Sequence, residues 1–191
     1  LVQTIDIAPT ILEFFNIARP PDMQGQPLRE TIVSDKPVRE AALFGMHGGH
    51  VNVTDGRHVY MRAPPTPHNG PLFEYTLMPM HLHTLFSGAE MRTAKLASPF
   101  DFTKNMPLLR IDALTDARRI PIQDGRKFDP DGGTTLYDLA TDVRQQRPFR
   151  DAAIERRFLH GIASVLRMHD APPEFYARYG VQVDAGADIA A

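Results

Sequence analysis

The sequence contains no cysteine, and this absence excludes disulfide bonds, thiolate metal sites and cysteine nucleophiles within the chain. It also lacks an excess of charge of either sign, because 21 lysine and arginine residues stand against 23 aspartate and glutamate residues. This balance argues against a nucleic-acid binder with a basic face and against a protein clamped to an anionic membrane. No run approaches the roughly 18 apolar residues of a membrane-spanning helix, so no such helix is predicted.

Familiar catalytic and nucleotide-binding motifs are missing as well. The sequence has no Gly-x-Ser-x-Gly nucleophile elbow, no P-loop and no dinucleotide-binding fingerprint. It also shows no carboxylate pair at metal-ligand spacing and no nucleophile beside an obvious base. The residues alone therefore indicate a protein whose polar chemistry is limited to histidine and arginine side chains along one edge.

The composition favours a folded α+β protein. Of the 191 residues, 42% are hydrophobic, which is enough to build a sizeable core in one domain or slightly more. The 17 prolines and 13 glycines indicate many turns and short elements, which is more typical of an α+β fold than of a helical bundle.

Hydrophobic periodicity predicts a helix near each end of the chain. The first covers residues 4–17, with Asp6 as its N-cap. Its buried stripe is predicted to consist of Ile7, Ile11 and Phe14 or Phe15. The second covers residues 151–169, with Phe158 and Ile162 on its apolar face. Residues 22–36 contain glycine, proline and mixed charge, and are predicted to be a loop.

Between the two helices the pattern changes to that of strands. Alternating runs at residues 51–53 and 58–62 flank an Asp-Gly pair, which is a strong hairpin signal. Further strands are predicted at residues 41–46, 72–77, 108–111 and 134–139. The sequence thus predicts a small antiparallel sheet of three to five strands, covered on its apolar face by the 151–169 helix.

The densest polar cluster is His-Gly-Gly-His-Val-Asn at residues 47–52. Its two glycines let the backbone turn sharply near a ligand, and the imidazoles of His47 and His50 could donate to an anion or transfer protons. Asn52 belongs to the same cluster, and Arg57 offers a guanidinium fork that suits sulfate, phosphate or carboxylate. These four residues are the predicted substrate-binding set. The alternative is a turn with two surface histidines and a solvated arginine.

Two segments of the sequence resemble metal sites only superficially. A zinc site that uses His47, His50, His81 and His83 can be imagined, but the separation of the two histidine pairs in the sequence gives no support for their convergence. The acidic sequence at residues 129–133 lacks the alternating ligands and closing glutamate of a calcium loop, and is predicted to be a turn.

Several segments, taken in order, resemble the C-terminal part of a sulfatase of the alkaline phosphatase superfamily. Residues 2–12 resemble the Asp-x-x-Pro-Thr-Leu helix start of that family. Residues 22–28 resemble the Gly-x-Ser-Leu stretch that follows it, with Gln-Pro where serine is usual at its centre. Residues 54–60 resemble the family's Asp-Gly strand. Residues 136–142 resemble its Leu-Tyr-Asp-Leu-x-x-Asp-Pro strand and turn, with Val143 in place of the usual proline. Residues 170–174 resemble a closing motif of one bacterial subgroup.

This resemblance implies where the chemistry of the whole protein lies. Sulfatases use a formylglycine made in a Cys/Ser-x-Pro-x-Arg motif, a calcium ion held by aspartate and asparagine, and lysine and histidine residues that bind sulfate. All of these lie upstream of the Asp6 helix in the family pattern, so the resemblance implies no catalytic residue, metal ligand or cofactor in this chain. It also implies a C-terminal subdomain that forms one rim of the active-site cleft. Its loops at residues 47–52, 64–71 and 97–133 would contact the substrate beyond the sulfate.

The resemblance also sets the expected organisation and partners. Residues 1–36 are expected to be the end of the α/β catalytic domain and a linker, residues 37–183 the C-terminal subdomain, and residues 184–191 a frayed tail. The start at Leu1, without an initiator methionine or signal peptide, leads us to expect a cut inside a larger protein. The expected partners are the protein's own N-terminal catalytic domain and a sulfated small molecule or carbohydrate. Self-association through the apolar face of residues 7–15 is a further hypothesis.

Two alternatives remain open from the sequence. Phosphodiesterases and phosphonate monoester hydrolases of the same superfamily share this C-terminal layout. A module that binds anionic carbohydrate without catalysis is the alternative from a different class, since the chain shows no nucleophile of its own.

Overall fold

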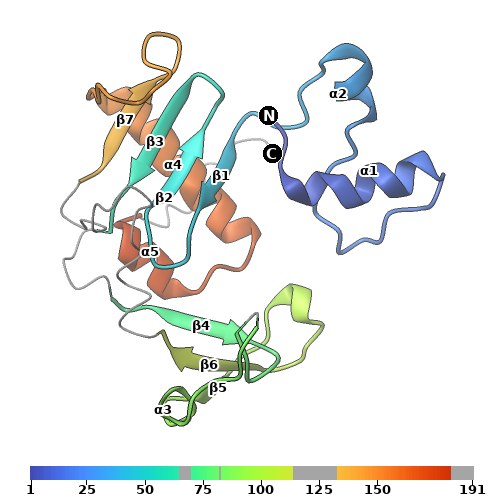
Figure 1. The fold of residues 1–191 in the computed structure, drawn as a ribbon, viewed down its shortest axis with the longest axis vertical. Helices are drawn as coiled ribbons and strands as arrows, with labels where there is room; N and C mark the ends of the chain where they lie inside the picture. Colours follow the sequence, from blue (N-terminus) through green and yellow to red (C-terminus); the bar gives the residue numbers. More distant parts are fainter. Residues whose placement is uncertain (65–69, 82, 114–132, 182–191) are drawn as a thin grey trace.

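The computed structural model describes residues 1–64, 70–81, 83–113 and 133–181. They form an α+β fold with two small antiparallel sheets (Figure 1). Sheet A has the strand order β1-β2-β3-β7, and sheet B has the order β4-β6-β5. The predicted fold class, a small antiparallel sheet with a long C-terminal helix, is confirmed.

Sheet A contains the predicted hairpin at its centre. Its strands are β1 (Ala42–Gly45), β2 (Val51–Thr54), β3 (His58–Arg62) and β7 (Thr135–Asp138). At the turn between β2 and β3, Gly56 has a φ of +91°, a conformation that glycine adopts without steric cost. The Asp55 carboxylate accepts from the amides of Arg57 and His58, at 2.9 and 2.6 Å, and so closes the turn.

The core lies between sheet A and α4 (Ala152–Met168). Tyr60, Leu136 and Ile162 have no exposed surface, and the Tyr60 ring stacks on Phe158 with centroids 6.0 Å apart. Asp151 starts α4 as predicted, because its carboxylate accepts from the amides of residues 153 and 154. Each fully buried side chain of this size contributes about 1.5–3 kcal/mol of hydrophobic stabilisation, so this interface holds the subdomain together.

Sheet B is a second sheet that the sequence did not predict as separate. It consists of β4 (Phe73–Thr76), β5 (Lys95–Ala97) and β6 (Leu108–Asp112). The predicted strand at residues 72–77 was expected to extend the first sheet, but β4 pairs only with β6. Hydrophobic periodicity predicts that a segment is a strand but not which strand it pairs with, and this explains why the second sheet was not predicted.

Short helices flank sheet B and close the described chain. They are α3 (Gly88–Met91), the 3₁₀ turn η2 (Asp101–Thr103) and α5 (Pro173–Tyr179). The Tyr75 hydroxyl of β4 donates to Glu174 of α5 at 2.5 Å. Burial raises the pKa of Tyr75 to about 12, with a further contribution from Glu174, so this phenol remains a donor at neutral pH.

The N-terminal residues form the 3₁₀ turn η1 (Thr4–Asp6) and the helices α1 (Ile7–Phe14) and α2 (Arg29–Ser34). Asp6 occupies the predicted N-cap position of α1, but the predicted capping bond is wrong, because its carboxylate makes no bond to the first turn of the helix. It instead accepts from the amides of Gln3 and Gln26, at 2.7 and 2.9 Å, and from both terminal nitrogens of Arg39. A buried carboxylate takes the strongest donors within reach, and here a guanidinium competes with the helix amides.

The prediction of a loop over residues 22–36 is wrong in part, since α2 lies within it. Pro27 precedes this helix, where a proline is tolerated, and Asp35 ends it with a φ of 56°. The six-residue helix is too short to show a clear period in the sequence, which explains why it was missed.

The helices α1 and α2 stand apart from sheet A (Figure 1). The predicted apolar stripe of α1 is exposed within this chain: Ile7 is 55% exposed, Ile11 52% and Phe14 79%. None of the helices in the described part of the chain is both long and apolar enough to cross a membrane. The predicted tail at residues 184–191 lies outside the described residues, as do most of the turn at residues 129–133 and parts of the loops at residues 64–71 and 97–133.

Candidate functional site

Both predicted histidines lie on the connection between β1 and β2, residues 46–50, which we call the histidine loop. His47 is exposed and His50 is half-buried, whereas Gly48 and Gly49 between them are buried. Gly48 has a φ of +83°, and the Gly49 amide donates to the Met46 carbonyl at 2.9 Å. The two glycines therefore allow the tight turn that the sequence predicted.

Two side chains of α5 donate hydrogen bonds to the backbone of the histidine loop, and each bond joins residues that are 130 positions apart in the sequence. A terminal nitrogen of Arg178 donates to the Gly48 carbonyl at 2.7 Å, and the Tyr179 hydroxyl donates to the Gly49 carbonyl at 2.9 Å. Both side chains belong to nearly fully buried residues. Hydrogen bonds with buried partners are costly to lose, so these two contacts hold the backbone that carries His47 and His50.

The electrostatic surroundings favour the neutral form of both imidazoles. Desolvation by the surrounding protein lowers the pKa of His47, although part of the residue remains exposed; Glu74 opposes this shift and Arg178 adds to it. Desolvation also lowers the pKa of His50, against an opposing hydrogen bond with the Gly133 backbone. At neutral pH both rings can donate one hydrogen bond and accept one, which suits contacts with hydroxyl groups better than charge pairing with an anion.

Asn52 lies on β2 just beyond the histidine loop, between Phe44 of β1 and Met61 of β3. Its neighbour Val53 points into the core, so the side chain of Asn52 lies on the opposite face of sheet A. The Asn52 side-chain oxygen is buried and has no hydrogen-bond partner among the described residues. Asn52 thus lies two positions after the histidine loop, on a strand that is paired on both sides.

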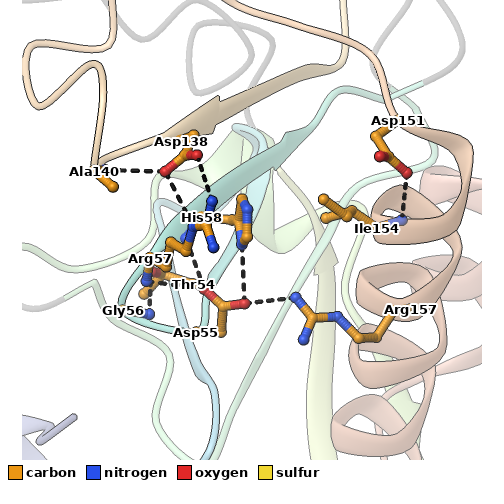
Figure 2. Close-up of polar contacts among 10 residues, drawn as sticks. All are labelled: Thr54, Asp55, Gly56, Arg57, His58, Asp138, Ala140, Asp151, Ile154 and Arg157. Carbon is orange, nitrogen blue, oxygen red and sulfur yellow. Dashed lines mark hydrogen bonds and ion pairs between the residues drawn. The ribbon is translucent and has the colours of Figure 1, made fainter.

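Arg57 is not brought together with the other three residues. It lies at the opposite end of the hairpin, where its guanidinium forms an ion pair with Asp138 at 3.0 Å (Figure 2). The Asp138 carboxylate also accepts from the Ala140 amide at 3.0 Å. Arg57 is exposed, so this pair contributes little to stability. Its role in this structure is to join β3 to β7.

A second polar cluster surrounds Asp55 at the same end of the hairpin. Its carboxylate contacts the His58 ring at 3.2 Å and Arg157 of α4 at 2.5 Å (Figure 2). Burial raises the pKa of Asp55, but the hydrogen bonds from His58, Arg157 and the Arg57 amide outweigh it and bring the value to about 2. The His58 ring packs against Phe149 and Phe158, with centroids 6.4 Å away in both cases. This cluster ties the hairpin turn to the helix and is structural.

Sequence reasoning missed three residues around the histidine loop: Glu74, Arg178 and Tyr179. Glu74 lies close enough to influence His47, and it also contacts the His81 ring at 3.2 Å. His47 and His81 are both members of the four-histidine set discussed above, and Glu74 influences the first and contacts the second. No local pattern in the sequence could have shown that three separate elements meet here.

The described ranges contain no group of three or more histidine, aspartate or glutamate side chains arranged to hold a metal ion. Comparison of the chain with models of known protein families finds no match. Comparison with curated proteins finds no similar sequence either.

Tyr179→Phe tests whether α5 holds the histidine loop. Removing the hydroxyl leaves the Gly49 carbonyl without its buried donor, so we expect a loss of about 1–3 kcal/mol in local stability. Hydrogen exchange of the Gly49 amide should become faster, while amides of β3 keep their rates. Tyr176→Phe on the same helix is the matched control and should leave the loop unchanged. Equal effects of both variants would show that the Tyr179 contact does not hold the loop.

Proposed function

We propose that this chain is the C-terminal portion of a sulfatase-type sulfuric ester hydrolase, in which it completes the fold and forms one rim of the substrate cleft. The observation that carries this proposal is spatial. Four of the five segments that resemble the sulfatase family contact one another in pairs, the first pair through the side chains of Asp6 and Thr10 and the second pair through backbone strand pairing. Chance matches scattered along a chain would have no reason to meet in this way.

The first pair lies at the N-terminus. Asp6, from the first segment, accepts from the amide of Gln26 in the second, and the Thr10 hydroxyl accepts from the Leu28 amide at 3.0 Å. Gly25 packs so closely that a Cβ there would lie 2.0 Å from the Ile5 carbonyl oxygen. Packing therefore requires a glycine at position 25, whereas Asp6 is held by its hydrogen bonds.

The second pair lies in sheet A. The third and fourth segments become β3 and β7, which pair antiparallel with His58 opposite Asp138. The Leu139 amide donates to the Arg57 carbonyl at 2.7 Å, and Leu136 is fully buried against α4. These motif residues build the fold, which agrees with a chain that supports a site without containing its nucleophile.

The exposed apolar surface of α1 and α2 also supports the proposal. A groove of about 480 Å³ between these helices is lined in part by Phe14, Ile32 and Val33, whose side chains are largely exposed. Apolar surface of this kind is typical of a site that another part of a protein covers. The proposed upstream catalytic domain would cover it, with residues 1–36 forming the end of that domain.

The alternative of an anion-binding module is less well supported. Such a module needs fixed positive charge, whereas the pKa values of His47 and His50 are lowered and Arg57 is already paired with Asp138. The calcium ion and formylglycine that the resemblance implies are assigned to the upstream part. Within this chain, the proposed role of the histidine loop is to contact hydroxyl groups of a sulfated small molecule or carbohydrate beyond the sulfate.

The test is an activity comparison on the complete polypeptide that contains this chain. We expect hydrolysis of 4-nitrophenyl sulfate and no comparable turnover of bis(4-nitrophenyl) phosphate or a phenylphosphonate ester. His47→Ala should raise KM for a sulfated disaccharide about ten-fold while leaving the small aryl sulfate nearly unaffected, and His83→Ala is the matched surface control. Preferential turnover of the phosphorus esters would favour the phosphodiesterase alternative. Binding of the disaccharide without any hydrolysis would favour the binding module.

A further inference from the structure

His81 lies between two glutamates, each of which contacts a different ring nitrogen. Its Nδ1 is 3.2 Å from Glu74 Oε2, and its Nε2 is 2.6 Å from Glu90 Oε1. Glu74 belongs to β4 and Glu90 to α3, so one imidazole joins two elements. The ring also packs edge-on against Phe86, with centroids 4.7 Å apart.

Glu90 is fixed in place independently of His81. Its side chain is only 3% exposed, and its carboxylate accepts from the Ser87 amide at 2.6 Å. The Ser87 hydroxyl accepts in turn from the Glu90 amide, which completes a capping box at the start of α3. The bonds with Ser87 are the main cause that lowers the pKa of Glu90, and His81 adds to it. Glu90 is therefore a rigid, charged acceptor at neutral pH.

A neutral imidazole carries one N–H group and can satisfy only one of these two carboxylates. The imidazolium carries two N–H groups and satisfies both. We propose that His81 is a proton-dependent clamp: when protonated it ties α3 and the residues just after β4 to sheet B, and loss of the proton opens one of its two contacts. Because only the imidazolium can donate to both carboxylates, both contacts are present when the ring is charged, and one of them is lost when the ring is neutral.

Other charged and titratable groups near the clamp come from three elements. His47 of the histidine loop lies near Glu74, which raises its pKa against the dominant effect of desolvation. Arg92 immediately follows α3. Arg110 of β6 stacks on Phe73 at 4.3 Å and therefore lies on the face of sheet B opposite to Glu74. None of these groups replaces the second proton that the two carboxylates require.

The clamp shares Glu74 with the candidate site, because this carboxylate contacts His81 and also influences His47. The protonation state of His81 therefore changes the net charge near His47. While His81 is protonated, it offsets part of the Glu74 charge; after deprotonation that charge acts in full on His47. The inference uses only contacts within this chain, so it stands whether or not the chain belongs to a sulfatase.

Hydrogen exchange of the full chain tests this clamp at two amides. The His81 amide donates to the Thr84 carbonyl at 2.7 Å, and the Phe86 amide donates to the Pro79 carbonyl at 3.1 Å. We expect their protection factors, corrected for intrinsic exchange, to fall about ten-fold or more between pH 5.5 and 8.5, because a charge-assisted hydrogen bond is lost. The Tyr60 amide in sheet A serves as the internal reference and should not change.

Three variants separate the clamp from a general effect of pH. His81→Gln should abolish the pH dependence of both amides, whereas His83→Gln, two positions away, should behave as the unmodified chain. Glu74→Gln provides a second test in case the His81 variant does not fold. The side-chain amide of the introduced glutamine can donate to the neutral His81 ring, so the protection of both amides should remain high at pH 8.5. Unchanged protection across the pH range, or the same pH dependence in His81→Gln, would overturn the proposal.

Discussion

Asp6→Ala is expected to destabilise the N-terminal unit formed by α1, α2 and Arg39 by about 3–5 kcal/mol. The Asp6 side chain has no exposed surface, and it satisfies two backbone amides as well as the Arg39 guanidinium. Its removal leaves Arg39, whose side chain is only 14% exposed, without its carboxylate partner. Hydrogen exchange of the amides of α1 and of Gln26 measures the loss. Glu40→Ala, an exposed carboxylate beside Arg39, is the control and should have no effect.

Asp6 also makes the free energy of unfolding depend on pH in the acid range. The hydrogen bond from Arg39, aided by the two amides, lowers the pKa of Asp6 from 3.8 to about 2 against the effect of burial. A depressed pKa contributes stability above the unfolded value, and this stability is lost as pH falls from about 4 towards 2. The shift corresponds to roughly 2 kcal/mol. Asp6→Asn should therefore flatten this part of the pH profile, and an unchanged acid transition in that variant would contradict the assignment.

Leu136→Ala is expected to lower the free energy of unfolding by about 2–5 kcal/mol. Leu136 is fully buried between sheet A and α4, where it packs in the same cluster as Tyr60 and Ile162. Its truncation leaves a cavity that strands of a paired sheet cannot close. Denaturant unfolding followed by circular dichroism measures the change, which should lower the midpoint without altering the slope.

The control for the core variant is Val143→Ala, which shortens an aliphatic side chain that is 76% exposed. It should change the unfolding free energy by less than about 0.5 kcal/mol. A similar loss in both variants would mean that Leu136 does not belong to the core.

Local features of this fold could be predicted because the signals that specify them are local. The Asp55-Gly56 turn and its alternating flanks specify the β2–β3 hairpin, and the apolar period of residues 151–169 specifies α4 with Phe158 and Ile162 inward. Asp151 fits its predicted place at the helix start because capping requires only neighbouring amides.

The features that were missed depend on contacts between distant segments. Asp6 has the sequence signature of an N-cap, but a guanidinium 33 positions away takes its carboxylate. The strand at residues 73–76 has the expected period, but its partner β6 creates a second sheet. The histidine loop was found from its Gly-Gly pair, whereas Arg178 and Tyr179, which hold it, lie in a short helix with no distinguishing pattern.

These observations give one account of the residues that resemble the sulfatase family. Asp6, Gly25 and Leu136 hold the fold, and in the proposed sulfatase the histidine loop would contact the substrate. Under this proposal the nucleophile lies in the upstream catalytic domain and the recognition residues lie on loops of this supporting subdomain.

The most direct test is mass spectrometry of the native polypeptide that contains this chain, with peptides assigned upstream of the Asp6 helix. The account predicts a Cys/Ser-x-Pro-x-Arg peptide whose first residue has been converted to an aldehyde. An unmodified serine or threonine at the corresponding position would contradict the sulfatase proposal and favour phosphoester chemistry. A native polypeptide without any upstream catalytic segment would contradict the enzyme proposal altogether.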